Sequence, residues 1–415
     1  MAIDFSLNPR QNALRGRARQ FAEAKLSALS RSVRHLPTAQ DRFLATRPVY
    51  EDMIAAGFLR ELIPTALGGD GEGLLDAAIL SEELYAGDAS VTLTLLGSVL
   101  GILPVVLAGS DEQRSRLLAP FLVTTGAPLA AFCLTEPGGS SNWSAPTPAE
   151  GVRTFARRTG EAWSITGAKK WVSSATGWDG AGADLLCIVC RGADASSDDL
   201  GVGILAAEPR QGEGAIVLDR AIESVGHRAH LQPEFRIIDL KVPERNVLAP
   251  MGHALPVTEA AFTATAALVG VFGVALMRAA WEFTLHFART EKRGGPHPII
   301  EHQAVGYALA DAKGAIEAVR GLCWRACYAL DHQQPCAAEL AIHAKIFGSE
   351  TAVRVITDLM RVVGVDSYDS ELPLGEWLQD ALALPIFDGG NVGVRRRQLH
   401  AMLRTPEYDP RATLI

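Results

Sequence analysis

The chain contains few features that would place it among secreted or metal-binding proteins. Its six cysteines form no regular framework, and the Cys187-x-x-Cys190 pair stands without a second pair. Neither a disulfide scaffold nor a metal site is therefore expected. The N-terminus has no basic region followed by an apolar stretch, so no signal peptide is predicted. We expect an intracellular, cytoplasmic protein with reduced and buried thiols.

Blocks of like charge are equally scarce. The net charge is −8, and the short run from Arg395 to Arg397 is the one cluster of a single sign. Nucleic acid is therefore not an expected partner. Two uncharged stretches, 89–110 and 260–277, are long enough to consider as membrane spans. Glycine and proline interrupt the first, and the second is rich in small residues, so both are predicted to be buried core helices, with no membrane contact.

The 415 residues, of which 48% are hydrophobic, exceed one typical domain. Apolar positions recur at three- and four-residue spacing as far as about residue 128, then alternate, then return to the helical period after about residue 247. This pattern predicts a helical domain (1–128), a compact β-barrel or sandwich (129–247) and a four-helix bundle (248–415). The expected helices are 9–29, 48–57, 74–85, 90–107, 111–118, 257–291, 301–331, 336–363 and 371–383, and the expected strands are 152–157, 163–167, 185–190, 202–206 and 234–240.

The strongest chemical signal lies near the C-terminus, where an apolar run from Ala381 to Phe387 leads to Asp388. Two glycines follow the acid, and Arg395 stands seven residues after it. A carboxylate held at a buried edge, beside a backbone that allows close approach, suits proton abstraction from carbon next to a flat cofactor. The same pattern is also typical of a residue that caps the last helix, and the two roles are compatible.

Two further motifs lie in the β-rich region. The stretch 131–143 reads as a strand that runs into a Gly- and Ser-rich loop, which offers backbone N–H groups and hydroxyls to an anionic or carbonyl-bearing ligand. The stretch 167–174 places Trp171 beside Ser173, so an aromatic ring and a hydroxyl could both face a planar ring system. Either motif alone is common at strand ends.

Together with the three-zone layout, these motifs resemble the acyl-CoA dehydrogenase superfamily of flavoenzymes over essentially the whole chain. The resemblance implies an α+β multidomain, acyl-CoA dehydrogenase-like fold with an N-terminal helical domain, a central β-barrel and a C-terminal four-helix bundle. It also implies FAD as cofactor and a homotetramer. Within the superfamily, the stretches 43–48, 266–270, 293–303 and 387–398 are most similar to the nitroalkane oxidase family.

The chain departs from ordinary acyl-CoA dehydrogenases at its acid and at one flavin motif. Those enzymes generally use Glu in a Tyr-Glu-Gly-Thr context, whereas Asp388 lies in Phe-Asp-Gly-Gly. Arg293-Gly294-Gly295 replaces their arginine–aromatic–glycine motif. These differences argue against a thioester substrate with a long CoA tail.

The resemblance implies a flavin-dependent oxidase. It would convert a small nitroalkane, O2 and water to an aldehyde or ketone, nitrite and H2O2, through α-proton abstraction and addition of the carbanion to flavin N5. One alternative is an acyl-CoA dehydrogenase, or another flavin oxidase of the same fold that acts on a nitrogenous secondary metabolite. A non-catalytic helical oligomer is the alternative from another class.

The resemblance also implies roles for individual residues. Asp388 would be the base, Arg395 would pair with it, Thr265 would replace a serine of the family, and Ser173 would hydrogen-bond the flavin near its reactive nitrogen. The predicted flavin contacts are Phe132, Cys133, Leu134, Thr135, Ser140, Ser141, Asn142, Trp171, Val172, Ser173, Ile386, Phe387, Asp388, Gly389 and Gly390. The predicted contacts to pyrophosphate and adenosine, some from a neighbouring subunit, are Arg293, His302, Gln303, Arg361, Val362, Val363, Gly364 and Val365.

Overall fold

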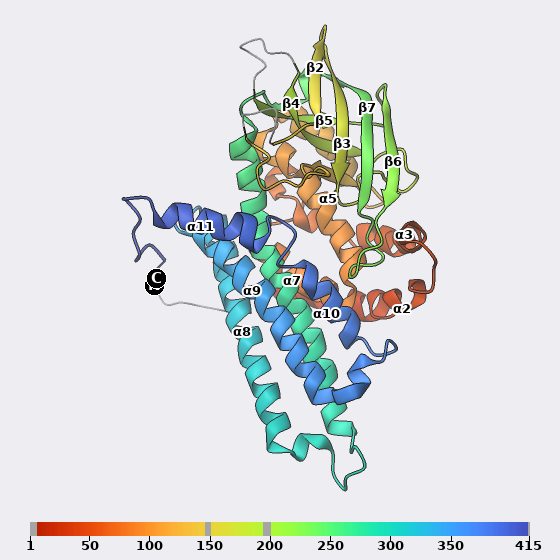
Figure 1. The fold of residues 1–415 in the computed structure, drawn as a ribbon, viewed down its shortest axis with the longest axis vertical. Coiled ribbons are helices and arrows are strands. Elements are labelled where there is room, and N and C mark those ends of the chain that lie inside the picture. The colour runs from red at the N-terminus through yellow and green to blue at the C-terminus, as the bar shows by residue number, and fades with distance from the viewer. Residues whose placement is uncertain (1–5, 146–150, 194–200, 414–415) are drawn as a thin grey trace.

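The computed structural model describes residues 6–145, 151–193 and 201–413 and begins with a helical domain (Figure 1). Its helices are α1 (Pro9–Phe21), α2 (Leu29–Val33), α3 (Ala39–Ala55), α4 (Leu74–Gly87), α5 (Ala89–Ala108) and α6 (Asp111–Leu118). Side chains cap several of them: Asn8 and Ser110 form capping boxes, and Thr38 accepts a hydrogen bond from the backbone N–H of Asp41. These caps explain why the helices begin where they do.

A single eight-stranded sheet follows, drawn at the top of Figure 1. Its strands are β1 (Ala130–Cys133), β2 (Phe155–Thr159), β3 (Ala162–Lys170), β4 (Leu185–Gly192), β5 (Val202–Ala207), β6 (Ala215–Ala221), β7 (Pro233–Pro243) and β8 (Val247–Ala249). The order is β6-β7-β3-β2-β4-β5-β8, and β1 pairs with β4 in parallel. Every residue of β4 from Leu185 to Cys190 is buried. A strand buried on both faces needs such a continuous apolar run.

Three long helices, α7 (Ala254–Thr290), α8 (Gln303–Asp331) and α9 (Ala337–Val363), form the lower part of the molecule (Figure 1). The shorter α10 (Leu374–Ala383) packs on α7 and α9. A π-helical turn, η8 (Asn391–Arg395), leads into α11 (Arg396–Leu403). Helix α4 packs against α7 and α8, so the N-terminal domain and the bundle share one apolar core. The predicted fold class is confirmed.

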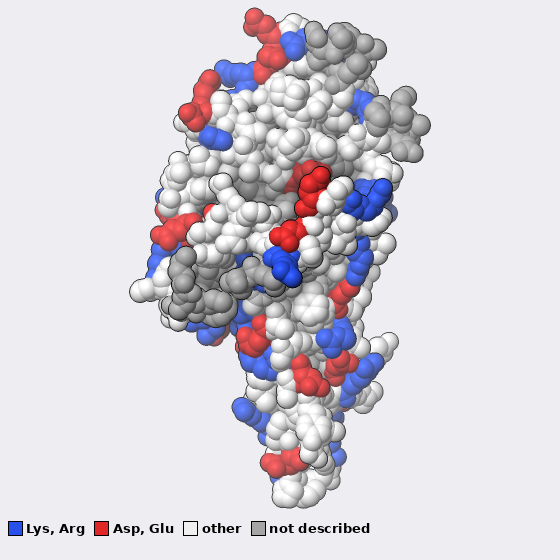
Figure 2. All heavy atoms as spheres, turned by 90° about the vertical axis from the view of Figure 1, so that its left-hand side faces the viewer, with Lys and Arg blue, Asp and Glu red and all other residues white. Residues whose placement is uncertain are grey.

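Helices α5 and α7 are long and apolar enough to cross a membrane by length and composition, yet 72% of the most apolar window of each is buried inside the protein. The prediction that both are core helices is confirmed. All six cysteines are free and buried, also as predicted. On the face shown in Figure 2, acidic and basic side chains are interspersed, without a large area of one sign.

Several element boundaries were predicted wrongly. The helix expected at 48–57 begins at Ala39, because Thr38 caps it, and Pro48 lies inside it. The helix expected at 9–29 ends at Phe21, where a π-helical turn (Ala22–Leu26) precedes α2. Strands β6 and β8 were not predicted. β6 is mostly exposed or half-buried and β8 has three residues, so neither carries the alternation that marks a strand.

Candidate active site

The turn between α10 and η8 has a strained backbone at its acid. Asp388 and Gly389 adopt left-handed conformations with φ of 53° and 72°. A Cβ on Gly389 would lie 3.0 Å from Nε of Arg395, so a side chain there would push this arginine away. The backbone N–H of Asn391 donates to the carbonyl of Pro385 at 2.9 Å and closes the turn. The glycine that the sequence marked is therefore required by the packing of Arg395.

Each carboxylate oxygen of Asp388 accepts one hydrogen bond. Thr265 on α7 donates through Oγ1 to Oδ1 at 2.8 Å, and Arg395 donates through Nη2 to Oδ2 at 3.1 Å. Only 5% of the Asp388 side chain and 1% of the Arg395 side chain is exposed. The predicted grouping of Asp388, Arg395 and Thr265 is thus present. The capping alternative is wrong, because Gly390 is the N-cap of η8 and Asp388 directs its oxygens elsewhere.

Arg395 also holds the surrounding backbone. Its Nη2 donates to the carbonyls of Asp388 and Phe262, both at 2.8 Å. A guanidinium presents five donors in a rigid plane, so one side chain can fix a carboxylate and its own turn together. This arrangement keeps Asp388 oriented.

Ser173 lies beyond the end of β3, next to α5. A Cβ on Gly97 of α5 would lie 2.8 Å from the Cβ of Ser173, so glycine is needed for this close approach. The Oγ of Ser173 is 3.0 Å from Nε2 of His230, and Nδ1 of His230 is 3.0 Å from Oγ1 of Thr94. Burial lowers the pKa of His230 to about 3, so the ring is neutral, with one nitrogen donating and the other accepting. If Thr94 donates to Nδ1, Nε2 donates to Ser173, and the serine hydroxyl is free to donate to a ligand.

The loop after β1 rests on a buried ion pair. Nζ of Lys169 lies 3.0 Å from Oε1 of Glu136 and also donates to the carbonyls of Leu134 and Val189. Glu136 in turn accepts backbone N–H groups of Arg153 and Thr154. Removal of one partner of such a pair is costly, so this pair firmly anchors the start of the Gly- and Ser-rich loop.

The far end of that loop meets the last helix. Arg397 on α11 donates to the carbonyl of Ser141 at 2.5 Å and to Oδ1 of Asn142 at 3.2 Å. A Cβ on Gly393 would lie 3.2 Å from Oγ of Ser141. Arg396 pairs with Glu350 at 2.7 Å, and both arginines are exposed. The tertiary structure therefore brings the 131–143 motif to the Asp388 turn.

Aromatic and apolar groups also lie at this junction. Trp171 has φ 61° and is 49% exposed, and Ile386 is 73% exposed. Phe132 stacks on Phe262 of α7 with ring centroids 5.6 Å apart. The backbone N–H of Lys170 donates to the carbonyl of Thr135, which ties the two predicted flavin motifs together. The side chains of Cys133, Leu134 and Val172 are buried in the core, so these three residues offer a ligand mainly their backbone.

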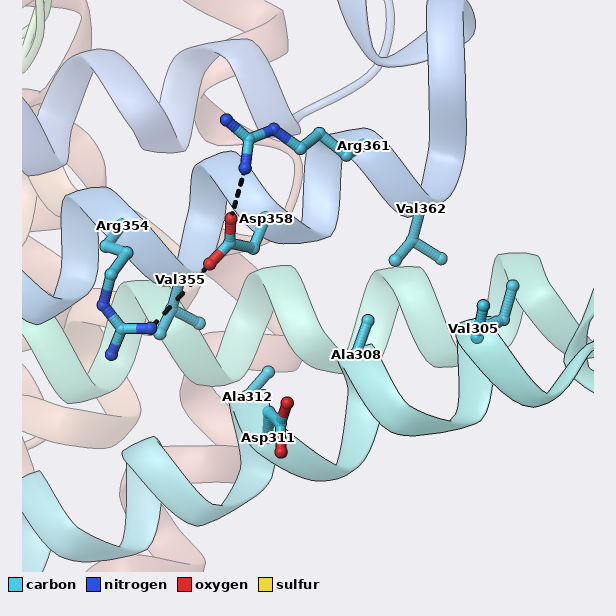
Figure 3. A pocket seen from close by; sticks show the side chains of 10 residues that line it. Val305, Ala308, Asp311, Ala312, Arg354, Val355, Asp358, Arg361 and Val362 are labelled. Atoms are coloured by element: carbon cyan, nitrogen blue, oxygen red, sulfur yellow. Dashed lines mark hydrogen bonds and ion pairs between the residues drawn. The ribbon is translucent and has the colours of Figure 1, made fainter.

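The residues predicted for pyrophosphate and adenosine gather elsewhere, at the opposite end of the bundle. Two adjoining cavities, of about 420 and 450 Å³, lie there. Figure 3 shows the first, which lies between α8 and α9. Arg293, His302, Val363, Gly364 and Val365 line the second cavity, Arg361 lines the first, and Val362 lines both. Gln303 lines neither, since its side chain donates to the hydroxyl of Tyr307.

Arg293 is held at the rim of the second cavity. It lies just after α7 with φ 49°, donates to the carbonyl of Val363 at 2.8 Å and pairs with Asp366 at 2.7 Å. Thr265, which contacts Asp388, and Thr290, which ends α7 near Arg293, are both on α7. At a helical rise of 1.5 Å per residue, the Asp388 turn and this end of the bundle are about 37 Å apart. One chain therefore cannot place both ends of a single dinucleotide in these two regions.

Two buried polar groups near Asp388 were missed by the sequence-based reasoning. Lys345 on α9 is fully buried and donates to Oδ1 of Asn391 at 2.8 Å. Lys345 lies on the apolar face of α9, four residues from both Ala341 and Ser349. A lysine is unusual at such a position, so the helical periodicity of the sequence could have identified it.

The second missed group is a chain of Tyr85, His227 and Asp380 beneath Phe387. The Tyr85 hydroxyl contacts Nε2 of His227, and the His227 backbone N–H donates to Asp380. Phe387 packs edge-on against His227. Burial lowers the pKa of His227 to about 4, so this ring is neutral. These residues are far apart in sequence and carry no local signal.

Comparisons with known proteins agree with this architecture. Residues 8–124 match the acyl-CoA dehydrogenase N-terminal domain, and residues 253–403 match the C-terminal domain. A nitroalkane oxidase of Podospora anserina is 39% identical over 99% of this chain and 98% of its own length. One of Fusarium oxysporum is 34% identical over 98% and 96%.

Solved structures agree as well. The Podospora anserina nitroalkane oxidase structure has a TM-score of 0.93 at 38% identity, with both chains fully covered. A nitroalkane oxidase active-site mutant crystallized with 1-nitrooctane has a TM-score of 0.94 at 34% identity and covers 99% of this chain and 100% of its own. The chain therefore belongs to the acyl-CoA dehydrogenase superfamily of FAD-dependent oxidoreductases and, within it, to the nitroalkane oxidase family.

Proposed function

We propose that this protein oxidises nitroalkanes with O2 and water to aldehydes or ketones, nitrite and H2O2. The observation that carries the proposal is the carboxylate of Asp388, held from both sides by Thr265 and Arg395 and almost fully withdrawn from solvent. A base fixed in this way can meet the α-carbon of a small substrate without reorganisation of the site.

The chain's own residues would perform the proton transfer. Asp388 would take the α-proton through a carboxylate oxygen, and the positive charge of Arg395 would remain beside the resulting anion. Ser173, at the end of the chain that runs through His230 to Thr94, would donate its hydroxyl to the cofactor edge. Bound FAD would supply the electron acceptor for the carbanion and pass the electrons to O2.

The residues around Asp388 fit the flat ring of FAD. Trp171 and Ile386 present exposed apolar surface, and the loop of Ser140 and Ser141 offers backbone N–H groups and hydroxyls beside it.

We propose that the Arg293 and His302 region serves the FAD of a neighbouring copy in a homotetramer, because about 37 Å of α7 separates it from the Asp388 turn. Analytical ultracentrifugation tests the assembly, and a monomer with bound FAD would contradict it.

The activity is tested by incubating the purified yellow protein with nitroethane while nitrite, oxygen uptake and the visible spectrum are recorded. We expect nitrite release with oxygen uptake. Butyryl-CoA with an artificial electron acceptor is the comparison substrate, and turnover of the thioester without nitrite release from nitroethane would overturn the proposal. Asp388→Asn should lose at least about a hundredfold in rate with nitroethane and much less with preformed ethyl nitronate, which needs no proton abstraction. Equal losses with both substrates would refute Asp388 as the base.

A further inference from the structure

A second buried cation lies behind the Asp388 turn. Lys345 is in the middle of α9, and none of its surface is exposed. Burial of an ammonium group is unfavourable unless hydrogen bonds and opposite charge compensate it. Its position on the apolar face of α9 is therefore not explained by core packing alone.

The direct partner of Lys345 is neutral. Nζ has three donors, and among the described residues only Oδ1 of Asn391 lies within hydrogen-bond range, at 2.8 Å. Asn391 is oriented by its own amide, which donates to Ser349 at 3.0 Å and to Glu350 at 3.1 Å. Compensation of the charge must therefore come from anions that Lys345 does not touch.

The charged groups that act on Lys345 come from three segments. They are Asp388 from the turn after α10, Arg395 from η8, and Glu350 from α9 itself. Glu350 is 44% exposed at its side chain and already paired with Arg396. Asp388 is thus the one buried anion among these neighbours, shared by two buried cations, Arg395 and Lys345.

We infer that Lys345 is a positioning residue for the base: its buried positive charge attracts the Asp388 carboxylate, and its bond to Asn391 holds η8 behind the turn. This role rests on the proposed function only where it concerns catalysis. Burial lowers the pKa of Lys345 to about 8, and the charge of Asp388 acts in the opposite direction. Because the interaction between two charges is reciprocal, removal of either charge must act on the other group.

The first test needs no substrate. The holoenzyme is labelled with lysine carrying ¹³C at its ε carbon, and the resonance absent from Lys345→Met is assigned to Lys345. We expect it to titrate near pH 8, and its midpoint to fall by about one pH unit in Asp388→Asn, which removes the anion but keeps the side-chain shape. Unchanged midpoints, or a midpoint near the ordinary lysine value, would overturn the inference. If Lys345→Met does not fold, Lys345→Gln supplies the assignment.

The second test uses the pH profile of kcat/KM with nitroethane. In Lys345→Met the midpoint of the acid limb should rise by about one pH unit. Below that midpoint kcat/KM should fall about tenfold, and on the alkaline plateau it should change little. Ser349→Ala is the matched control, since it removes a hydrogen bond to Asn391 and no charge, so its midpoint should stay in place. A purely structural lysine would lower the rate equally at every pH. A protein inactive with nitroethane that still shows the lysine coupling would contradict the proposed function and leave this inference standing.

Discussion

Oγ1 of Thr265 lies 2.8 Å from Oδ1 of Asp388, opposite the oxygen that Arg395 contacts. The hydroxyl also lies 3.4 Å from the carbonyls of Ala261 and Phe262, one turn back on α7. One hydroxyl hydrogen cannot serve three acceptors, and the charged carboxylate is the shortest and strongest of them. Thr265 therefore fixes the orientation of the Asp388 carboxylate relative to the rigid helix α7.

Substitution of Thr265 tests that link. Thr265→Val keeps the branched shape and removes the donor, so kcat/KM for nitroethane should fall about tenfold to a hundredfold, because hydrogen bonds to charged groups contribute about 1.5–3 kcal/mol. Thr265→Ser keeps the hydroxyl and should stay within about threefold of wild type. Steady-state oxygen uptake measures both. A Val variant as active as the Ser variant would contradict the role of the hydroxyl.

Ser173 and Ser174 form a matched pair of adjacent serines. Ser173 contacts His230, whereas the buried Oγ of Ser174 contacts no hydrogen-bond partner among the described residues. Ser173→Ala should slow reduction of the cofactor by nitroethane about tenfold and shift the visible spectrum, since a donor to the flavin is lost. Ser174→Ala should leave both unchanged. Stopped-flow absorbance measures the rate of cofactor reduction and the spectrum. Identical behaviour of the two variants would contradict the role of the Ser173 hydroxyl.

The ion pair of Lys169 and Glu136 predicts a stability effect coupled to cofactor retention. Lys169→Met leaves a buried carboxylate without its cation and should destabilise the protein by about 3–5 kcal/mol. The loop after β1 should loosen, and the FAD content of the purified protein should fall. The double variant Lys169→Met with Glu136→Gln removes both charges and should recover part of the loss. Thermal unfolding and the ratio of flavin to protein absorbance measure these effects, and a double variant no better than the single one would contradict the explanation.

Asp88 predicts a pH-dependent stability. It caps α5 by accepting the N–H of Val91 at 2.9 Å, and burial raises its pKa to about 7. Between pH 3.8 and about 7, the carboxyl group of Asp88 is protonated in the folded protein and ionised in the unfolded chain. The free energy of unfolding therefore falls as the pH rises through this range. Asp88→Asn keeps the cap and cannot ionise. The substitution should raise Tm at pH 8 and raise it less at pH 5. At pH 8 the free energy of unfolding should increase by roughly 2–4 kcal/mol.

The control for Asp88 is Asp111→Asn, since Asp111 is fully exposed in the first turn of α6. Its effect on Tm should be small at both pH values. Calorimetry at pH 5 and pH 8 makes the comparison. A gain for Asp88→Asn that does not grow with pH would show that the carboxyl is ionised without cost.

Local patterns in the sequence were sufficient to predict the three-zone organisation and to single out Asp388. Helical and alternating periods reflect which face of each element is buried, so they mark α5, α7 and β4 without knowledge of their neighbours. The Asp-Gly-Gly turn and the arginine seven residues later are also local, because a single turn holds both. The resemblance to a flavoenzyme family then identified Thr265 and Ser173, which periodicity alone does not distinguish from other small polar residues.

Tertiary structure decided what surrounds these residues. Lys345 and Asp388 are far apart in sequence, and the pairing of His230 with Ser173 depends on how the turn before β7 meets α5. The separation of the Arg293 region from Asp388 follows from the length and straightness of α7 across the bundle (Figure 1). Contacts between distant segments depend on how whole elements pack, and the energy of a buried charge depends on every group around it. The sequence by itself therefore determined the elements and singled out Asp388, and the packing of those elements determined the electrostatic surroundings of that residue.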